Sequence, residues 1–514
     1  MYSRSKAYQT INEVKMKIHF EDIKSKGQSK IKVFIICDDM KPTKLLAESH
    51  KNIDDFFAIK KSFKGKVGSI SGALFNGENC MVGVVGAGEN KKIARKQLQS
   101  VGAAIATKLN AMKVEEGDVF IESNLISENI KDLQTAAAYI AEGIKLRNYK
   151  FTKHYFDKKK DHELTLQSVN IFVENHEKAA QIFERHRITA DGVMFTRDLV
   201  SEPGNIIYPE SFAKKCMELE KFGLKVRVLD KNEMTKLGMG SLLAVAQGSA
   251  NEAKLVVLEW WGDKHDVLPL AVIGKGVTFD TGGINLKSSH HIAEMKYDMA
   301  GAGVVAGLLR SLAEQKVKKN VIGFLGLVEN MPSGTAQRPS DVVVSMSGQT
   351  IEVDNTDAEG RMVLADVMWF AQTEYNCQTL IDLATLTGAI SVALGDEFAG
   401  LFSNNDQLAD HLKQAGKDVN ELLWRMPLSD HYDNRVNSDI ADIRNTGKIS
   451  GAGATTAAQF LKRFLKDKNR SWAHLDIAGV AWTSNGELTN GLKGATGFGV
   501  RLLEQFINTY YKPE

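Results

Sequence analysis

Two carboxylates and a guanidinium group occur at alternate positions in the stretch NTDAEGRMVLAD (355–366), as Asp357, Glu359 and Arg361. A nearly unbroken apolar run begins directly after them, which predicts a buried helix. Charged side chains beside a buried segment cost free energy unless they are paired or bind an ion. The stretch is therefore a candidate functional site.

A second group of ionisable residues lies upstream, around the apolar stretch VIGKGVTFDTGG (272–283). Lys275 interrupts this predicted strand, and Asp280 ends it before a pair of glycines. Lys287 follows in INLKSS, and Asp298 comes in MKYDMAGAG, where a helix is expected to begin. Taken alone, an aspartate before a helix is more often an N-cap than a ligand. An ammonium inside an apolar strand, however, requires a partner or a function.

Together, four carboxylates supply hard oxygen ligands: Asp280, Asp298, Asp357 and Glu359. Crowded at one edge of a sheet, they would repel one another and raise their pKa values, and divalent cations would offset that repulsion. Two metal ions about 3.5–4 Å apart can activate a water molecule and polarise a carbonyl group. A neutral Lys275 amine could also ligate a metal. Lys287 and Arg361 would then be the cations that face a substrate.

Other catalytic motifs are absent from the sequence. The His-Glu pairs at 162–163 and 176–177 do not continue as H-E-x-x-H, because Leu166 and Ala180 stand where the second histidine is required. There is no G-x-S-x-G nucleophile elbow and no Walker A loop. The glycines of GAGVVAG (301–307) do not match a dinucleotide fingerprint, and close packing of a helix on a strand explains them better.

The elements that must position these residues are predicted from the long apolar runs of the second part of the chain. Six runs read as buried strands: LKVRVLD, KLVVLEW, PLAVIGKGVTFD, KNVIGFLGLVEN, QTLIDLATL and WAHLDIAG. Helical stretches alternate with them, among them YDMAGAGVVAGLLRSLAEQ and GRMVLADVMWFAQTEY. This alternation predicts an α/β fold with a central mixed, largely parallel sheet. Such sheets bind ligands at the carboxyl ends of their strands.

The first part of the chain predicts a separate and smaller α/β domain, because short apolar strands such as KIKVFIICDD and SVNIFVE lie between Lys-rich polar segments. A long amphipathic stretch then ends before Pro203 and Gly204, which break a helix. We therefore expect an N-terminal domain over 1–175, a connecting helix over 176–200 and a larger C-terminal domain with the candidate site over 201–514.

The composition is that of an ordinary globular protein, with 25% charged residues and a formal net charge of +2, which indicates no polyanionic partner. Four cysteines lie far apart and form no C-x-x-C pair: Cys37, Cys80, Cys216 and Cys377. This spacing favours a reducing compartment over a disulfide framework. The N-terminal residues lack the apolar region of a secretory signal. The most apolar stretch, LIDLATLTGAISVAL (380–394), is too short to span a bilayer comfortably and is expected to be buried core. We expect a cytoplasmic protein without a membrane partner.

The residues of the candidate site resemble those of the leucyl (cytosol) aminopeptidase family, which are dinuclear-metal exopeptidases. The resemblance rests on VIGKGVTFDTGG, MKYDM and NTDAEGR, and it extends through RDLVSEPGN, GMGSLLAVAQGS, ATLTGA and WAHLDIAG. Over the first domain it rests on the size and order of the elements, and residues 1–14 match nothing in it. The resemblance implies a two-domain α/β enzyme whose larger C-terminal domain is catalytic.

The resemblance implies five metal ligands: Lys275, Asp280, Asp298, Asp357 and Glu359. Asp280 and Glu359 would bridge the two ions, and Asp298 with Lys275 would complete the coordination of one. Asp357 would bind the other ion, partly through its backbone carbonyl. Family members use zinc, manganese or magnesium and assemble as hexamers. Two divalent ions per subunit and a homo-hexamer are therefore expected.

The resemblance also implies how a peptide would be cleaved. Lys287 would bind the carbonyl oxygen as it becomes an oxyanion, and Arg361 would hold a bicarbonate ion that acts as general base for the metal-bound water. A metal-bridging hydroxide would attack the first peptide carbonyl of a substrate with a free N-terminus, with leucine and other large apolar first residues preferred. Four residues lie where family members line the pocket for the first side chain, with core packing as the alternative role: Met295, Thr385, Leu386 and Ala478.

The sequence departs from the family pattern in the loop after Lys287, in GAGATTAAQFL (451–461) and at Met362, where leucine is typical, and it leaves a second class of function open. LKSSHHIAEM lacks the proline that commonly follows the catalytic lysine, and His290–His291 could tune this loop, although a surface loop is the plainer account. The lysine clusters KKIARK (91–96) and FDKKKD (156–161) are compatible with an oligomeric DNA-binding regulator. That role requires a continuous basic groove and binding that weakens steeply with salt. The intact set of charged residues argues against a catalytically inactive scaffold.

Overall fold

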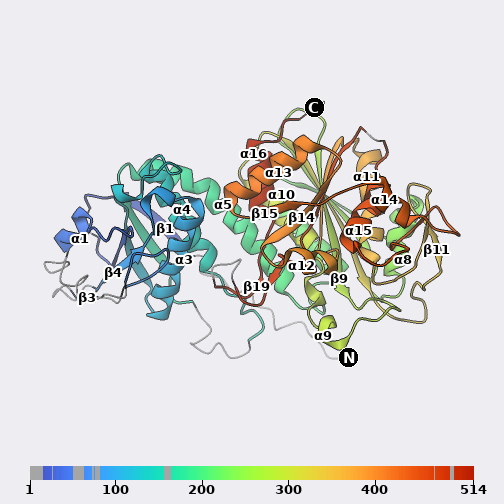
Figure 1. The fold of residues 1–514 in the computed structure, drawn as a ribbon, viewed down its shortest axis with the longest axis horizontal. Coiled ribbons are helices and arrows are strands. Elements are labelled where there is room, and N and C mark those ends of the chain that lie inside the picture. The colour runs from blue at the N-terminus through green and yellow to red at the C-terminus, as the bar shows by residue number, and fades with distance from the viewer. Residues whose placement is uncertain are drawn as a thin grey trace. The chain divides into compact units, whose positions relative to one another are not determined.

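The computed structural model describes residues 16–25, 27–49, 63–71, 74–75, 81–155, 164–467, 469–486 and 491–513. The chain divides into two compact units, Met1–Arg187 and Ile188–Glu514, and each contains its own large sheet (Figure 1). The division falls inside helix α5 (His176–Ser201), which occupies the stretch expected to connect two domains. Residues 1–14, the cluster at 156–161 and Cys80 lie outside the described residues. The exact domain limits stay a prediction.

The N-terminal unit is built on a six-stranded sheet in the order β1-β6-β5-β2-β4-β3. Neighbouring strands are parallel, except that β3 pairs antiparallel with β4. The strands are β1 (Lys17–Asp22), β2 (Ile31–Ile36), β3 (Leu74–Phe75), β4 (Met81–Gly86), β5 (Glu116–Phe120) and β6 (Ser168–Val173). The helices are α1 (Lys44–Ser49), α3 (Arg95–Ala111), α4 (Leu133–Arg147) and the first part of α5, with short 3₁₀ turns η1 (Asn90–Lys92) and η2 (Ser123–Leu125). The apolar residues form two cores: Val33 and Val119 of the sheet lie with Ile105 and Ile140 of the helices in one, and Phe34 and Phe120 lie with Leu46 of α1 in a smaller one.

The C-terminal unit is built on an eight-stranded sheet in the order β15-β14-β17-β13-β9-β10-β8-β7. Its middle strands β17, β13, β9 and β10 run parallel, and β14 and β8 join them antiparallel on either side. These strands are β7 (Lys225–Leu229), β8 (Lys254–Trp261), β9 (Leu270–Asp280), β10 (Asn320–Asn330), β13 (Thr379–Ala384), β14 (Phe398–Ser403), β15 (Leu422–Arg425) and β17 (Ser471–Asp476). Smaller sheets contain β11 (Val342–Val344), β12 (Thr350–Glu352) and β16 (Ile443–Arg444), and β18 (Trp482–Thr483) with β19 (Gly494–Ala495). The predicted fold class, α/β with a mixed and largely parallel sheet, is confirmed.

Helices cover both faces of this sheet (Figure 1). One face carries α10 (Ala300–Glu314), α13 (Asp406–Val419) and α16 (Val500–Thr509), and the other carries α8 (Gly240–Ala246), α11 (Glu359–Glu374) and α15 (Gly453–Lys462). The remaining helices are α6 (Pro209–Met217), α7 (Lys231–Lys236), α9 (Ser289–Ile292), α12 (Gly388–Leu394) and α14 (Asp430–Asp433), with 3₁₀ turns η4 (Glu218–Phe222), η5 (Met295–Tyr297) and η6 (Asn434–Val436). The central strands β9, β10, β13 and β17 are buried on both sides, which explains why they read as continuous apolar runs. The edge strand β7 has exposed and half-buried residues, so the prediction of a buried strand at LKVRVLD was wrong.

Two glycines allow α10 to lie directly on the sheet. A Cβ atom on Gly274 would lie 2.5 Å from the Cα atom of Ala302, and a Cβ atom on Gly301 would lie 2.2 Å from the carbonyl oxygen of Leu383. Only glycine permits such close backbone approach. The glycine pattern at 301–307 is thus explained by packing, as predicted, and it brings the start of α10 next to β9.

No helix in the described part of the chain is long and apolar enough to cross a membrane. The apolar stretch 380–394 is divided between β13 and α12, and Val392 of α12 is 91% exposed, so the expectation of a wholly buried segment was wrong for its second half. Cys37, Cys216 and Cys377 are buried free thiols.

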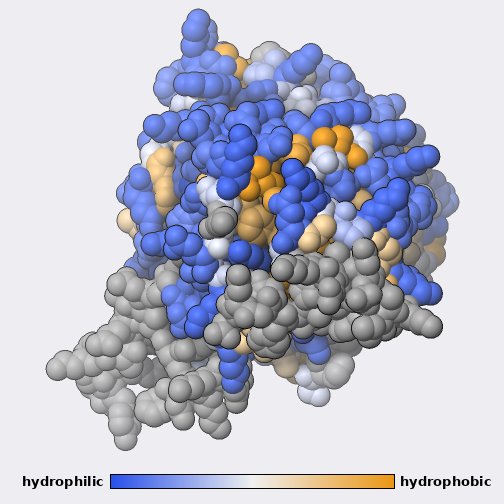
Figure 2. Space-filling view, turned by 90° about the vertical axis from the view of Figure 1, so that its left-hand side faces the viewer, coloured by the Kyte–Doolittle hydropathy of each residue, from blue (hydrophilic) through white to orange (hydrophobic). Residues whose placement is uncertain are grey.

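On the face shown in Figure 2, hydrophilic residues predominate around a small group of hydrophobic ones.

Candidate metal centre

The carboxyl ends of parallel strands β9, β10 and β13 meet at one edge of the C-terminal sheet. Asp280 is the last residue of β9 and is paired in register with Asn330, the last residue of β10. Thr385 follows the end of β13. Because these strands end together, their terminal side chains are brought to the edge where α/β sheets bind ligands.

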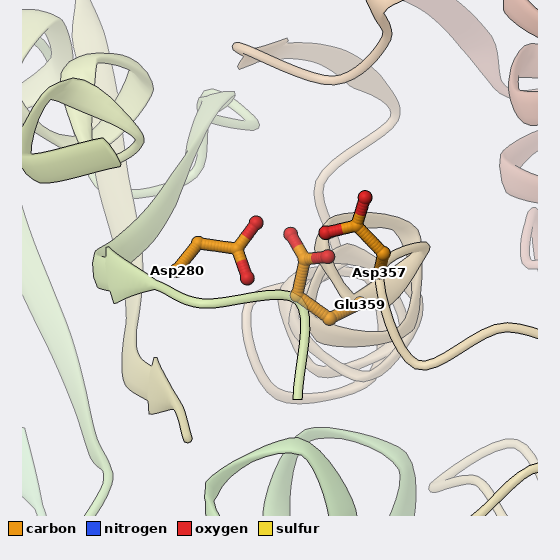
Figure 3. A group of neighbouring side chains, drawn as sticks. All are labelled: Asp280, Asp357 and Glu359. Carbon is orange, nitrogen blue, oxygen red and sulfur yellow. The ribbon is translucent and has the colours of Figure 1, made fainter. Parts of the chain in front are cut away.

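The stretch NTDAEGR completes the site from the other side of this edge. Asp357 lies in the turn after β12, and Glu359 is the first residue of α11. Asp280, Asp357 and Glu359 each offer a carboxylate oxygen, and these oxygens lie within 4.8 Å of one another. Figure 3 shows the carboxylates of Asp280 and Glu359 pointing toward each other, with Asp357 beside Glu359. Residues far apart in the sequence therefore form one acidic cluster.

Lys275 has the partners that its buried position requires. Its Nζ atom lies 2.8 Å from Oδ1 of Asp298 and 2.8 Å from Oε1 of Glu359, and it donates a hydrogen bond of 2.9 Å to the carbonyl oxygen of Thr385. A Cβ atom on Gly360 would lie 2.7 Å from the Lys275 side chain. Gly360 is a helical residue whose missing side chain makes room for Lys275.

Lys287 supplies a second ammonium group at the open side of the cluster. Its Nζ atom lies 2.9 Å from Oδ2 of Asp280 and also forms an ion pair with Asp357. The lysine is 16% exposed at its side chain, whereas Lys275 is 3% exposed. Lys287 is therefore the cation of the pair that a bound molecule could reach.

Burial and mutual repulsion raise the pKa values of three carboxyl groups at the site. Burial raises the pKa values of Asp298, Asp357 and Glu359, and the negative charge of Asp280 raises them further. Burial by itself would lower the pKa values of Lys275 and Lys287, but the surrounding carboxylates raise both. The carboxylates thus hold excess negative charge in a buried place, which positive ions stabilise.

The donor set fits divalent cations. Oδ2 of Asp298 and Oε2 of Glu359 are buried and accept no hydrogen bond from any residue that the structure describes. Unpaired buried carboxylate oxygens are costly unless a cation binds them. Four carboxylates and a lysine in this arrangement offer the oxygen and nitrogen ligands that such ions use.

Arg361 lies close to the cluster and is buried, with 7% of its surface exposed. It makes no hydrogen bond or ion pair with any residue in the described ranges, and its Nε atom is buried without a partner. Burial lowers its pKa to about 10, although Glu359 and Asp476 act in the opposite direction. A guanidinium group with free donors is suited to a planar anion such as a carboxylate or bicarbonate.

The four predicted pocket residues have different surroundings. The hydroxyl of Thr385 donates a 2.7 Å hydrogen bond to Oδ1 of Asp298, so this residue supports a candidate ligand directly. Leu386 and Ala478 are half-buried beside the core, and their backbone N–H groups both donate hydrogen bonds to Oδ1 of Asp476. Met295 is half-buried at the start of η5, next to β9. The side chains of His290 and His291 lie outside the described residues.

Sequence reasoning missed the residues that hold the cluster in shape. Four of them make hydrogen bonds around the turn at 354–358 or to Asp280: Asn285, Asn330, Thr356 and Asn445. Asp476 is a fifth, because it accepts hydrogen bonds from the backbone N–H of Leu386 and from the hydroxyl of Thr387, in the segment that follows Thr385. The available signal was position, since Asn330 and Asp476 end buried strands at the same edge as Asp280.

Comparisons with known proteins identify the family. Residues 194–504 match the model of the cytosol aminopeptidase family, catalytic domain, and residues 42–155 match that of its N-terminal domain. A probable cytosol aminopeptidase of Rickettsia felis is 48% identical over 90% of this chain and 93% of its own length. The cytosol aminopeptidase of Rickettsia prowazekii is 46% identical over 94% of this chain and 95% of its own length.

A solved structure has a similar fold. The bottromycin maturation enzyme BotP in complex with Mn superposes with a TM-score of 0.82 at 29% identity, covering 94% of this chain and 99% of that one. The matched ranges thus lie in both units, and the range 194–504 contains the positions of the acidic cluster. The chain belongs to the cytosol aminopeptidase family, and membership makes it a peptide hydrolase that depends on divalent metal ions.

Proposed function

We propose that the protein is a dinuclear-metal aminopeptidase that removes leucine and other large apolar residues from the N-terminus of peptides. The observation that carries the proposal is the buried carboxylate cluster with unpaired oxygens beside Arg361, an arginine to which no described residue is bonded. Such a cluster calls for cations, and such an arginine calls for an anion. A purely structural role would leave neither kind of group without a partner.

Two divalent ions would be held by five residues: Lys275, Asp280, Asp298, Asp357 and Glu359. When bound, manganese, zinc or magnesium ions would polarise the peptide carbonyl and lower the pKa of a water molecule. The short contacts of Lys275 with Asp298 and Glu359 support its membership in this set, because its nitrogen already lies among the oxygen donors.

Lys287 and Arg361 would act on the substrate rather than on the ions. Lys287 carries a positive charge at the open side of the cluster, where it would stabilise the carbonyl oxygen as negative charge develops on it. Arg361 would hold a bicarbonate ion close to the cluster, and this anion would accept the proton of the attacking water. No other group is needed as the general base.

The substrate's first side chain would lie against Met295, Thr385, Leu386 and Ala478. Support comes from Asp476, which draws the backbone of Leu386 and Ala478 to one carboxylate oxygen and so holds two of the four together. Leu386 and Ala478 are apolar and half-buried, as a wall for a leucine side chain requires.

We propose that the protein assembles as a cytoplasmic homo-hexamer. Its mass would then be near six times the 56.6 kDa of one chain, which analytical ultracentrifugation would test. The comparisons lend no support to the DNA-binding alternative.

Hydrolysis of leucine p-nitroanilide and leucine amide tests the function. We expect activity with Mn²⁺ or Zn²⁺, loss of activity after treatment with a chelator, and recovery when either metal is added back. N-acetyl-leucine amide is the matched control, because it differs only in the blocked amine and should not be cleaved. Absence of hydrolysis under every metal condition would refute the proposed function, and chelator-insensitive hydrolysis would refute the role of the metals.

A further inference from the structure

Asn330 connects the two halves of the carboxylate cluster through a single side chain. It is 1% exposed and ends β10 in register with Asp280. Its Nδ2 atom donates one hydrogen bond of 2.9 Å to Oδ1 of Asp280 and another of 2.9 Å to the carbonyl oxygen of Thr356. Both amide protons are therefore used, one on each half of the site.

The bond to Asp280 determines which carboxylate oxygen faces the cluster. Oδ1 of Asp280 accepts from Asn330 and also from the backbone N–H of Gly282 at 2.8 Å. Oδ2 lies 2.9 Å from Nζ of Lys287, on the side of the other carboxylates. A free carboxylate rotates about a broad, roughly two-fold torsion. Two protein donors on one oxygen remove that freedom and present the other oxygen to the cluster.

The bond to Thr356 acts on the residue directly before Asp357. The Thr356 hydroxyl donates a hydrogen bond of 2.6 Å to the carbonyl oxygen of Gly282. The backbone N–H of Thr356 donates another, of 2.9 Å, to Oδ1 of Asn285. The turn is thus tied to the loop after Asp280, and Asn330 adds a link from the turn to the carboxylate of Asp280 itself. Loss of this link would loosen Asp280 and Asp357 together.

We propose that Asn330 is a positioning residue that fixes the orientation of Asp280 and its spacing from Asp357 for the metal pair. The inference rests on the proposed function. Asn330 would raise metal affinity by holding Asp280 and the turn before Asp357 in place, without itself binding a metal ion. Outer-shell partners of this kind typically alter metal affinity by about 10–100-fold when they are replaced.

Asn320 offers a matched control on the same strand. It is the first residue of β10, is also 1% exposed, and its amide makes three hydrogen bonds to backbone groups, to Lys264, Val267 and Asp263. It lies at the opposite end of an eleven-residue strand, about 30 Å away along the chain. Replacing either asparagine costs comparable buried hydrogen bonds, but only Asn330 touches the cluster.

The experiment compares metal binding to the metal-free forms of the wild type, Asn330→Ala, Asn330→Leu, Asn320→Ala and Asn320→Leu. Calorimetric titration with Mn²⁺ gives the affinity, and the visible absorption of the Co²⁺-loaded forms reports ligand geometry. Urea unfolding of the metal-free forms shows the cost to stability. Leucine fills the volume of the amide, so one Asn330 variant keeps the packing if alanine prevents folding.

We expect both Asn330 variants to bind Mn²⁺ about 10–100-fold more weakly and to show an altered Co²⁺ spectrum, while the Asn320 variants lose stability but keep wild-type affinity and spectrum. Equal affinities and spectra for the Asn330 and Asn320 variants would overturn the inference and leave the proposed function intact. A wild-type protein that binds no metal would instead overturn the proposed metal centre, and this inference with it.

Discussion

At the scale of single residues, replacing Arg361 should affect activity and stability differently. It is buried without a bonded partner among the described residues, and replacing such a charge by an apolar side chain of similar size is often neutral or stabilising. We expect Arg361→Met to unfold at the same or a higher temperature than the wild type. If Arg361 holds the anion that acts as base, kcat on leucine p-nitroanilide should fall about 10²–10⁴-fold. Thermal unfolding and steady-state kinetics measure the two effects.

Arg470 is the matched control for this change. It is also buried, but it donates hydrogen bonds to the carbonyl oxygen of Cys377 and to Asn376, near the start of β13 and away from the cluster. Arg470→Met should lower the free energy of unfolding by about 1–3 kcal/mol, since buried acceptors lose their donor, and should leave kcat near the wild-type value. The interpretation of Arg361 fails if its own methionine variant loses stability as Arg470→Met does and keeps its activity.

The same scale shows what the sequence could and could not predict. Lys275 stands out because it interrupts an apolar strand, and Asp280 because it ends that strand. Their grouping with Asp298, Asp357 and Glu359 is found in the structure. Asn330 could not be recognised in the same way, because a buried amide at a strand end has many structural roles. Its importance depends on the register of β9 with β10, which periodicity does not contain. The roles of the site residues stay a prediction for the experiments above.

At the scale of elements, α11 is joined to its neighbours by a buried carboxylate, Asp366. It accepts hydrogen bonds from the N–H of Leu242 in α8 at 2.9 Å and from that of Met346, between β11 and β12, at 2.8 Å. Burial raises its pKa from 3.8 to about 7, although these hydrogen bonds lower it. The folded protein therefore keeps a proton on Asp366 that the unfolded chain releases, and this proton makes stability depend on pH.

The sign of that dependence follows from proton binding. Between about pH 4 and pH 7 the folded state holds more protons on Asp366 than the unfolded state, so this residue's contribution is fully present below pH 4 and is lost as pH rises through 7. The change amounts to about 4 kcal/mol at most. Urea unfolding from pH 4 to 8 should show Asp366→Asn becoming more stable relative to the wild type as pH rises. Parallel curves for the two proteins would contradict the assignment.

Elements also show where the pattern of apolar runs stops being informative. The parallel strands at the centre of the C-terminal sheet were predicted because each is a long run buried on both faces, as in β9 and β10. Strand β14 was not among the predicted strands, although the polar segment 395–397 separates it from α12, and its antiparallel pairing with β17 depends on contacts remote in sequence. The sequence therefore predicted the fold class, a mixed and largely parallel sheet, but not the order of its strands.

At the scale of the whole molecule, metal binding should stabilise one unit and leave the other unchanged. The candidate ligands all belong to Ile188–Glu514, while Met1–Arg187 has a sheet and a core of its own. Free metal at a hundred times its dissociation constant adds about 2.7 kcal/mol per site to the stability of the state that binds it. Hydrogen exchange of the metal-free and Mn²⁺-loaded proteins should therefore show slower exchange at the end of β9, the turn at 354–358 and the first turn of α11. Strands β2, β4 and β5 serve as the internal reference, because no candidate ligand lies in their unit, and slower exchange there to the same degree would mean that the metal acts on the chain by some route other than this cluster.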